Sequence, residues 1–429
     1  MQTRFTPDQL ADPAMASSEG VIRKCVHCGF CTATCPTYAL LGDELDSPRG
    51  RIYLIKDMLE NRRKPGPETV KHIDRCLSCL SCMTTCPSGV NYMHLVDHAR
   101  AYIHENYQRP WHERAVRRLL AAVLPYPGRF RAALTLAKLG RPFAPLFAGV
   151  KPLAAMLAMA PKQIPAPVPA ANATVPGANG RVALLQGCAE PGLKPEYRAA
   201  AIRLLNRAGF DVVFAAGEGC CGALVHHMGR EADSLDAARR NVDAWMREID
   251  DGGLAAIVVT ASGCGTTIKD YGFMLRGDPA YADKAAQVSG LAKDISELLV
   301  EADLPPGDGR GLTVAYHAAC SLQHGQKVTD APKRLLATAG YTVRTPAEAH
   351  LCCGSAGTYN ILQPEIAGQL GARKASNLAR LHADVIATGN VGCAMQIARH
   401  GETPIVHTIE LLDWATGDPA PAIFAHRGA

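Results

Sequence analysis

Long apolar runs are missing from this sequence of 429 residues. The best candidate, residues 133–160, is interrupted by Lys138, Arg141 and Lys151, which argues against a membrane-spanning helix. The N-terminus lacks the apolar core of a secretory signal, so we expect a chain of the reducing cytosol. The net charge is only +5, and no basic stretch is interleaved with aromatic residues, so no nucleic-acid partner is expected.

Cysteine, in contrast, is abundant, with sixteen copies. Eight lie between positions 25 and 86, and eight lie between positions 188 and 393. A disulfide framework is typical of small secreted chains, which this sequence does not resemble. We therefore expect the cysteines to bind metal or to carry redox chemistry.

Two segments, CVHCGFCTATCP (25–36) and CLSCLSCMTTCP (76–87), follow the pattern C-x2-C-x2-C-x3-C-P. Bacterial ferredoxins bind two 4Fe–4S clusters with this run, and its fourth cysteine reaches the other cluster. Zinc sites need only two C-x2-C pairs, so zinc is the weaker interpretation. We assign cluster 1 to Cys25, Cys28, Cys31 and Cys86, and cluster 2 to Cys76, Cys79, Cys82 and Cys35.

The stretch between the two motifs predicts an α-helical ferredoxin-type domain. Residues 47–62 have a helical pattern, with Ser47 as the N-cap and Pro48 as the first helical residue. Six cations near the motifs could offset the negative charge of the clusters, although each one alone is more simply a solvated surface residue: Arg23, Lys24, Arg49, Arg51, Lys71 and Arg75.

The second half of the chain is a duplicated unit. The 32-position step from Cys188 to Cys220 recurs from Cys320 to Cys352, and Cys-Gly follows in both copies. Short apolar runs alternate with helical patterns such as residues 195–209, which predicts βαβ units and parallel sheets. The predicted strands are Val182–Leu185, Val212–Ala215, Ala256–Val259, Val314–Tyr316, Tyr341–Val343 and Val385–Ala387.

The predicted fold class is an α+β multidomain protein. An α-helical ferredoxin domain (1–110) precedes a helical segment with a Pro/Ala-rich linker (111–180). A pseudo-twofold pair of α/β cysteine-rich domains follows (181–305 and 306–429). Loops at the carboxyl ends of parallel strands form ligand crevices. We therefore expect the repeats to gather a third redox site from Cys188, Cys220, Cys221, Cys264, Cys320, Cys352, Cys353 and Cys393.

Three interpretations of the paired cysteines stay open. They could form a strained, redox-active disulfide, ligate metal or an open cluster, or pack as buried free thiols. Histidines near the paired cysteines could be ligands or proton carriers, although loop histidines are more often partly exposed polar groups. These are His226, His227, His317, His324 and His350, of which His317 and His350 are best placed.

A nucleotide site is not expected in the repeats. GEGCCG (217–222) formally matches G-x-G-x-x-G, but the corresponding AEAHLCCG (347–354) lacks the first two glycines. We expect these glycines to let the backbone approach a cluster instead. No other flavin or nicotinamide fingerprint appears.

The combined motifs resemble the glycolate oxidase iron–sulfur subunit family over residues 20 to 415. The phrases CVHCGFCTATCPTY, LDSPRGRIYLIK and CLSCLSCMTTCPSGV carry the resemblance especially closely. It implies an electron-transfer subunit with two 4Fe–4S clusters, whose partner flavoprotein holds FAD and oxidises glycolate to glyoxylate. Electrons would pass to a quinone or another acceptor, and the complex would lie on the cytoplasmic face of the inner membrane.

Alternatives remain at this stage. Lactate-utilisation and anaerobic glycerol-3-phosphate dehydrogenase subunits share the architecture, as do heterodisulfide reductase-like domains, which imply a thiol–disulfide reductase. The fullest reductase pattern closes with C-x2-C, but Ala261 and Asn390 stand at those places here, which puts a carried-over non-cubane cluster in doubt. A scaffold without C-terminal chemistry is also open. The Arg-rich, apolar segment 111–160 predicts peripheral membrane contact, a partner face or plain scaffolding.

Overall fold

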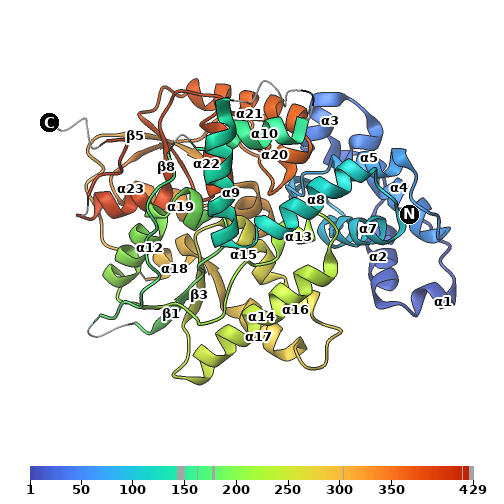
Figure 1. Ribbon diagram of the computed structural model, residues 1–429, viewed down its shortest axis with the longest axis horizontal. Coiled ribbons are helices and arrows are strands. Elements are labelled where there is room, and N and C mark those ends of the chain that lie inside the picture. Colours follow the sequence, from blue (N-terminus) through green and yellow to red (C-terminus); the bar gives the residue numbers. More distant parts are fainter. Residues whose placement is uncertain are drawn as a thin grey trace.

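A computed structural model describes residues 1–142, 149, 151–161, 163–175, 179–302, 304–417 and 419–424. Parts of the predicted linker, and the last five residues of the chain, lie outside this description. The N-terminal helices gather at one end of the molecule, and the two sheets with their helices form the rest (Figure 1).

The first 110 residues are helical and contain no strand, which confirms the predicted helical ferredoxin-type region. Ser47 accepts a hydrogen bond from the Gly50 amide at 3.0 Å, and Pro48 begins the predicted helix. The elements are α1 (Pro7–Leu10), α2 (Pro13–Lys24), η1 (Phe30–Thr32), α3 (Pro36–Leu41), η2 (Glu44–Asp46), α4 (Pro48–Glu60), α5 (Pro67–Asp74), α6 (Ser81–Thr85) and α7 (Tyr92–Asn106).

The first repeat is a four-stranded parallel sheet in the order β2-β1-β3-β4. Its strands are β1 (Arg181–Leu184), β2 (Asp211–Val213), β3 (Ala256–Val259) and β4 (Ala292–Asp294). Its helices are α11 (Glu190–Leu193), α12 (Glu196–Arg207), α13 (Ala223–His226), α14 (Glu231–Asp250), α15 (Ser262–Lys269), α16 (Tyr271–Met274), α17 (Ala282–Leu291) and α18 (Ile295–Glu301).

The second repeat has the same topology, in the order β6-β5-β7-β8. Its strands are β5 (Thr313–His317), β6 (Thr342–Arg344), β7 (Val385–Thr388) and β8 (Ile405–His407). Its helices are the π-helical η4 (Ser321–Gly325), α19 (Ala331–Thr338), α20 (Tyr359–Leu362), α21 (Pro364–Ala379), α22 (Val391–Ile397) and α23 (Thr408–Ala415).

All six predicted strands are confirmed within two residues, but β4 and β8 were not predicted. Each of these two strands has only three residues, and both end on a polar side chain, Asp294 or His407, that then caps the next helix. A run this short has no recognisable period in the sequence. Pairing with β3 or β7 holds it in the sheet.

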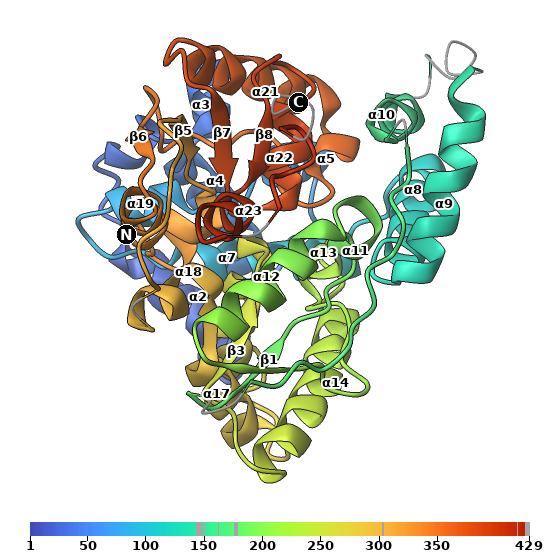
Figure 2. The same ribbon diagram turned by 90° about the vertical axis from the view of Figure 1, so that its left-hand side faces the viewer.

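One hydrophobic core joins the two repeats. α12 packs against α23, and α18 packs against α19. Buried residues of both repeats, such as Leu204 and Leu336, belong to the same cluster. Figure 2 shows α12 and α23 between the two sheets. The repeats therefore hold each other in a fixed orientation.

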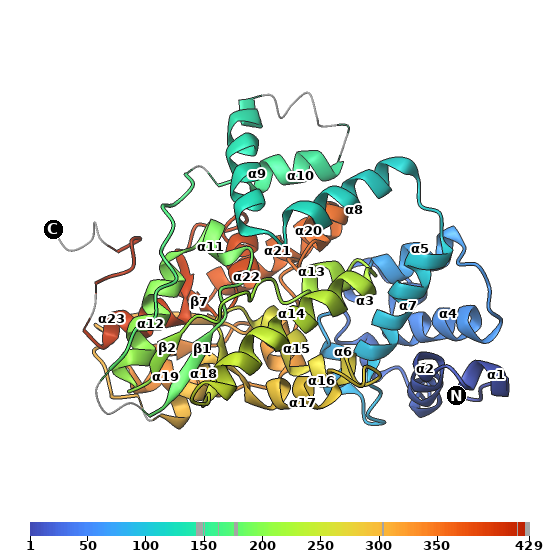
Figure 3. The same ribbon diagram turned by 60° about the horizontal axis from the view of Figure 1, so that its bottom comes forward.

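In the described part of the connection between the ferredoxin-type region and the first repeat lie α8 (Trp111–Val123), α9 (Pro127–Gly140) and α10 (Lys151–Met159). They run along the outside of the molecule (Figure 3). Among the described residues, no helix is long and apolar enough to cross a bilayer.

Candidate functional site

A first cavity is lined by five cysteines of the N-terminal region. Cys25, Cys28 and Cys31 come from the first motif, and Cys82 and Cys86 come from the second. Between the first three cysteines, His27 and Gly29 have φ angles of +59° and +88°. These left-handed residues turn the chain so that successive thiols face the same space. We call this space cavity one.

Cavity two repeats the arrangement one motif later. It is lined by Cys76, Cys79, Cys82 and Cys35, all of them buried. Ser78 and Leu80 supply the left-handed turns, with φ angles of +49° and +62°. Cys82 lines both cavities, which places them next to each other. Burial raises the pKa of the Cys79 and Cys82 thiols well above the usual range, because it disfavours the charged thiolates. A bound cation would favour the thiolates and lower the pKa again.

Each cavity brings together the four thiols that the sequence assigned to one cluster, and Cys82 of cluster 2 also lines cavity one. Four thiols on left-handed turns are the donor set that a 4Fe–4S cluster requires, so the residues present fit the group. The assignment of each thiol to a cluster stays a prediction. Cavity one reaches the surface at the exposed Cys28.

One cation is built into the wall of cavity two. The Arg51 side chain is only 1% exposed, and its guanidinium donates to the Cys35 sulfur at 3.8 Å and to the Thr37 hydroxyl at 2.9 Å. Burial alone would lower the pKa of Arg51, but the neighbouring Cys76, Tyr92 and Cys35 raise it. Arg51 therefore places a permanent positive charge beside the thiols.

The side chains of the other five predicted cations, all among the described residues, make no hydrogen bond to a cysteine sulfur. Arg23, Lys24 and Lys71 are exposed, while Arg49 pairs with Glu44 and Arg75 pairs with Asp46. Sequence reasoning missed two other contacts with Cys76. The Tyr92 hydroxyl donates to its sulfur at 3.8 Å, and Arg100 donates to its carbonyl at 2.6 Å. Both residues come from α7, and nothing local in the sequence points to them.

The C-terminal cysteines form two separate groups, one in each repeat. Group one consists of Cys188, Cys220, Cys221 and Cys264. Interaction with the Cys188 and Cys221 thiols lowers the pKa of Cys220, and interaction with Cys220 raises the pKa of the other two. All sixteen cysteines, each of them a described residue, are free thiols, so the structure contains no vicinal disulfide.

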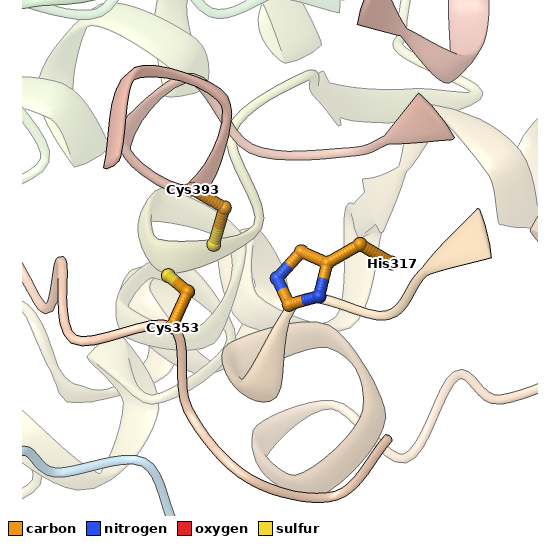
Figure 4. A group of neighbouring side chains, drawn as sticks. All are labelled: His317, Cys353 and Cys393. Atoms are coloured by element: carbon orange, nitrogen blue, oxygen red, sulfur yellow. The ribbon is translucent and has the colours of Figure 1, made fainter. Parts of the chain in front are cut away.

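Group two consists of Cys320, Cys352, Cys353 and Cys393. The sulfurs of Cys320 and Cys352 lie 3.7 Å apart. Cys353 and Cys393 lie beside the ring of His317 (Figure 4), and the ligand atoms of these three residues are all within 4.8 Å of one another. Burial, followed by the charge of Lys374, lowers the pKa of His317 well below its usual value, so the imidazole is neutral.

Cavity two lies against the second repeat. Cys79 and Cys352 belong to one buried cluster with Leu77 and Tyr359. The Tyr359 hydroxyl donates to the Arg75 carbonyl at 3.0 Å. Nearby, the Thr84 hydroxyl and His324 Nδ1 are 2.8 Å apart. Group two is therefore the C-terminal cysteine group that contacts the ferredoxin-type region around cavity two.

The five candidate histidines have different surroundings. His317 alone is grouped with cysteine sulfurs as a potential metal ligand among the described residues. His226 pairs with Asp97, and His324 contacts Thr84 and the carbonyl of His350. His227 and His350 are half-buried.

The glycines of the two CCG sequences lie against helices, and the expectation that they let the backbone approach a cluster stays a prediction. Gly222 and Gly354 have φ angles of +87° and +88°. A Cβ on Gly354 would lie 2.6 Å from the Ala367 carbonyl oxygen in α21, and one on Gly222 would lie 3.1 Å from that of Ser234 in α14. These positions need glycine because a helix backbone passes directly beside them.

Comparison with known protein families agrees with this arrangement. Residues 24–90 match the family described as a 4Fe-4S dicluster domain, and residues 182–269 and 314–398 match the cysteine-rich domain family. A solved structure, a hypothetical protein from Helicobacter pylori, superposes with a TM-score of 0.55 over 95% of this chain and 73% of that one. At 11% identity, this likeness shows the fold alone.

Relatives found by sequence similarity are more informative. The glycolate oxidase iron-sulfur subunit of Escherichia coli (strain K12) is 43% identical over 97% of this chain and 99% of its own length. A probable glycolate oxidase iron-sulfur subunit of Bacillus subtilis (strain 168) is 31% identical over 92% of this chain and 93% of its own length. Lactate utilization protein A of Bacillus licheniformis is 28% identical over 54% of this chain and 99% of its own length. From its matched domains and its full-length similarity, this chain belongs to the glycolate oxidase iron–sulfur subunit family.

Proposed function

We propose that this chain is the iron–sulfur electron-transfer subunit of a glycolate dehydrogenase complex. A partner flavoprotein with FAD would oxidise glycolate to glyoxylate, and the electrons would continue to a quinone or another acceptor. The observation that carries the proposal is a pair of adjoining cavities, together lined by all eight N-terminal cysteines, in a chain 43% identical to a glycolate oxidase iron-sulfur subunit. Bound in such sites, 4Fe–4S clusters supply one-electron transfer.

The eight N-terminal cysteines would each hold one iron corner. Cys25, Cys28, Cys31 and Cys86 would ligate cluster 1, and Cys76, Cys79, Cys82 and Cys35 would ligate cluster 2. Arg51 would offset their negative charge from inside the wall. The proposal includes the division of the chain into four parts, with boundaries at residues 110, 180 and 305.

The two cavities have different surroundings, which gives the relay a direction. Around cavity one, the side chains of Val26, Phe30 and Tyr53 are 67%, 63% and 59% exposed. Electron transfer requires close approach, and exposed apolar residues beside a redox site favour a docking face. We place the flavoprotein at this face. Cavity two, enclosed against the second repeat, would serve the acceptor side.

We also propose that α8 and α9 provide peripheral membrane contact on the cytoplasmic face of the inner membrane. Trp111, Leu119, Leu136 and Leu139 are large apolar side chains on these helices, and all are exposed. Basic residues accompany them, including the exposed Arg118. Exposed apolar side chains beside cations suit an anionic lipid surface. Binding to anionic vesicles that is unchanged by Leu136→Ser with Leu139→Ser would argue against this contact.

Co-expression of the chain with its flavoprotein tests the main proposal. The purified complex should contain about eight iron atoms per chain and should reduce a quinone when glycolate is added. Much less iron, or turnover with L-lactate or glycerol 3-phosphate but not glycolate, would contradict the assignment. L-lactate is the alternative to test first, because a lactate utilization protein is among the relatives. Reduction of disulfides by the chain alone would favour a thiol–disulfide reductase.

The docking face has its own test. Phe30→Glu should slow glycolate-dependent reduction of the clusters while leaving reduction by dithionite unchanged. Leu10→Glu is a matched control, since Leu10 is an exposed apolar residue that does not line cavity one. Equal effects of the two substitutions would place the flavoprotein elsewhere.

A further inference from the structure

His317 lies at the end of β5 and is almost completely buried, with 1% of its surface exposed. Among the described residues, neither of its ring nitrogens has a hydrogen-bond partner. Buried polar groups nearly always have a partner, because leaving one unpaired costs about 1–3 kcal/mol. An imidazole buried in this way needs a bound group to satisfy it.

The neighbours of this ring are sulfur atoms. Cys353 comes from the loop with the sequence CCG at residues 352–354, which we call the CCG loop, and Cys393 lies in the first turn of α22. The His317 ring extends from the end of β5 towards both thiols, and one ring nitrogen faces them (Figure 4). Three distinct elements thus bring one imidazole and two thiols together, all buried, with their ligand atoms within 4.8 Å of one another.

We propose that the second repeat binds a single divalent metal ion, of the zinc or iron type, through His317, Cys353 and Cys393. This site goes beyond the proposed electron-transfer function and does not depend on the substrate of the complex. Sulfur and imidazole ligands in a tetrahedral arrangement are typical of zinc and of iron. Donors bound at about 2.0–2.3 Å lie about 3.5–3.8 Å apart, so the three atoms need to close in by about 1 Å.

The fourth ligand is available in the same group. Cys320 and Cys352 interact electrostatically with Cys393, and Cys320 also does so with Cys353. The 3.7 Å between the Cys320 and Cys352 sulfurs is already the separation of two thiolates on one tetrahedral ion. The buried ammonium of Lys374 interacts with all four thiols of group two and would offset surplus negative charge.

The first repeat is an internal control for this site. Cys221 and Cys264 correspond to Cys353 and Cys393, but Leu185 stands where the second repeat has His317. Leu185 packs in an apolar cluster that also contains Cys221. Both copies of the duplicated unit therefore contain four cysteines, but only the second has an imidazole nitrogen at this position. We infer that the mixed sulfur and nitrogen site is specific to the second repeat.

Metal analysis of the anaerobically purified, full-length chain tests the proposal. The wild-type chain should contain one zinc per chain, or one iron beyond the eight of the two clusters. His317→Leu should lose this ion at least tenfold while keeping the eight cluster irons. Leucine at this position is tolerated in the first repeat, so the variant should fold. His350→Leu, on the same loop as Cys353 but outside the three ligands, is the matched control and should keep the ion.

The donor set provides a second readout. X-ray absorption at the edge of the bound metal should detect one nitrogen at about 2.0–2.1 Å together with sulfur at about 2.3 Å. His317→Cys should retain the ion with a shell of sulfur alone. A wild-type chain without an additional ion would overturn the proposal. So would a His317→Leu chain that keeps the ion with unchanged ligands, or a disulfide between Cys353 and Cys393 in the isolated protein.

Discussion

An enclosed ion pair joins the ferredoxin-type region to the first repeat. Asp97 Oδ2 on α7 lies 3.2 Å from His226 Nε2 on α13, and the two side chains are 11% and 15% exposed. Burial would raise the pKa of Asp97, but His226, His227 and Arg100 outweigh it and lower the pKa to about 2. Asp97 in turn raises the pKa of His226, against the effect of burial. The pair therefore stabilises the contact between the two regions.

The pKa shift sets the size and the pH range of this stabilisation. A fall in the pKa of Asp97 from 3.8 to about 2 corresponds to about 2 kcal/mol. A lowered carboxyl pKa contributes stability above pH 3.8 that is lost as the pH falls towards 2. A raised histidine pKa contributes stability that is complete below pH 6.5 and is lost as the pH rises above it. Both contributions are present between about pH 4 and pH 6.5.

Asp97→Asn removes the charge and keeps the shape of the side chain. Unfolding entropy is about 2.1 cal/mol/K per residue, or about 0.9 kcal/mol/K for the whole chain, so 2 kcal/mol corresponds to about 2 °C. The midpoint of thermal unfolding, followed by circular dichroism, should therefore fall by about 2 °C at about pH 6. The loss should be smaller at about pH 8.5, where His226 is less protonated and mainly the attraction of Arg100 remains.

A surface pair provides the control. Asp57 and Arg63 are 3.1 Å apart, but their side chains are 47% and 64% exposed. Exposed pairs contribute only about 0–1 kcal/mol, so Asp57→Asn should shift the midpoint by less than about 1 °C. Hydrogen exchange in α7 and α13 should rise only in the Asp97 variant. An Asp97→Asn deficit of the same size at both pH values, or none at pH 6, would refute the role given to the pair.

Three further predictions concern the cysteine sites and their surroundings. Gly354→Ala should lower the unfolding free energy by at least about 2 kcal/mol, because the residue has a positive φ and its Cβ would meet a carbonyl of α21. Gly368→Ala, in open space on the same helix, should stabilise by about 0.5–1 kcal/mol, and equal effects of the two substitutions in denaturant unfolding would contradict this reasoning. Arg51→Gln should reduce the iron bound per chain, because it removes the hydrogen-bond donor to Cys35 and the cation beside the buried Asp46 carboxylate. A variant with full iron content would contradict this expectation. Tyr359→Phe should cost about 1 kcal/mol in the same unfolding assay through loss of its bond to the ferredoxin-type region, and an unchanged midpoint would contradict that.

The sequence by itself determined the features that depend on local order. The spacing of the cysteines predicted which motif thiols share a cavity, because a C-x2-C-x2-C run wraps around one space. Ser47 and Pro48 marked the start of α4, because an N-cap acts within a single turn. The matched spacing from Cys188 to Cys220 and from Cys320 to Cys352 revealed the duplication, and with it the two parallel sheets of the same topology.

Tertiary structure alone decided which residues surround these sites. Six cations lie near the motifs in sequence. A cation contacts a buried sulfur only where its helix directs the side chain inwards, and α4 directs Arg51 towards Cys35. Five histidines lie near the paired cysteines in sequence. Contact between a histidine and two thiols requires β5, the CCG loop and α22 to converge, and of these five histidines His317 lies at that point. Likewise, cavity two meets group two because packing of the ferredoxin-type region on the second repeat brings Cys79 and Cys352 together. Residues hundreds of positions apart leave no period or spacing that could predict such a contact, because folding of the whole chain sets their distance.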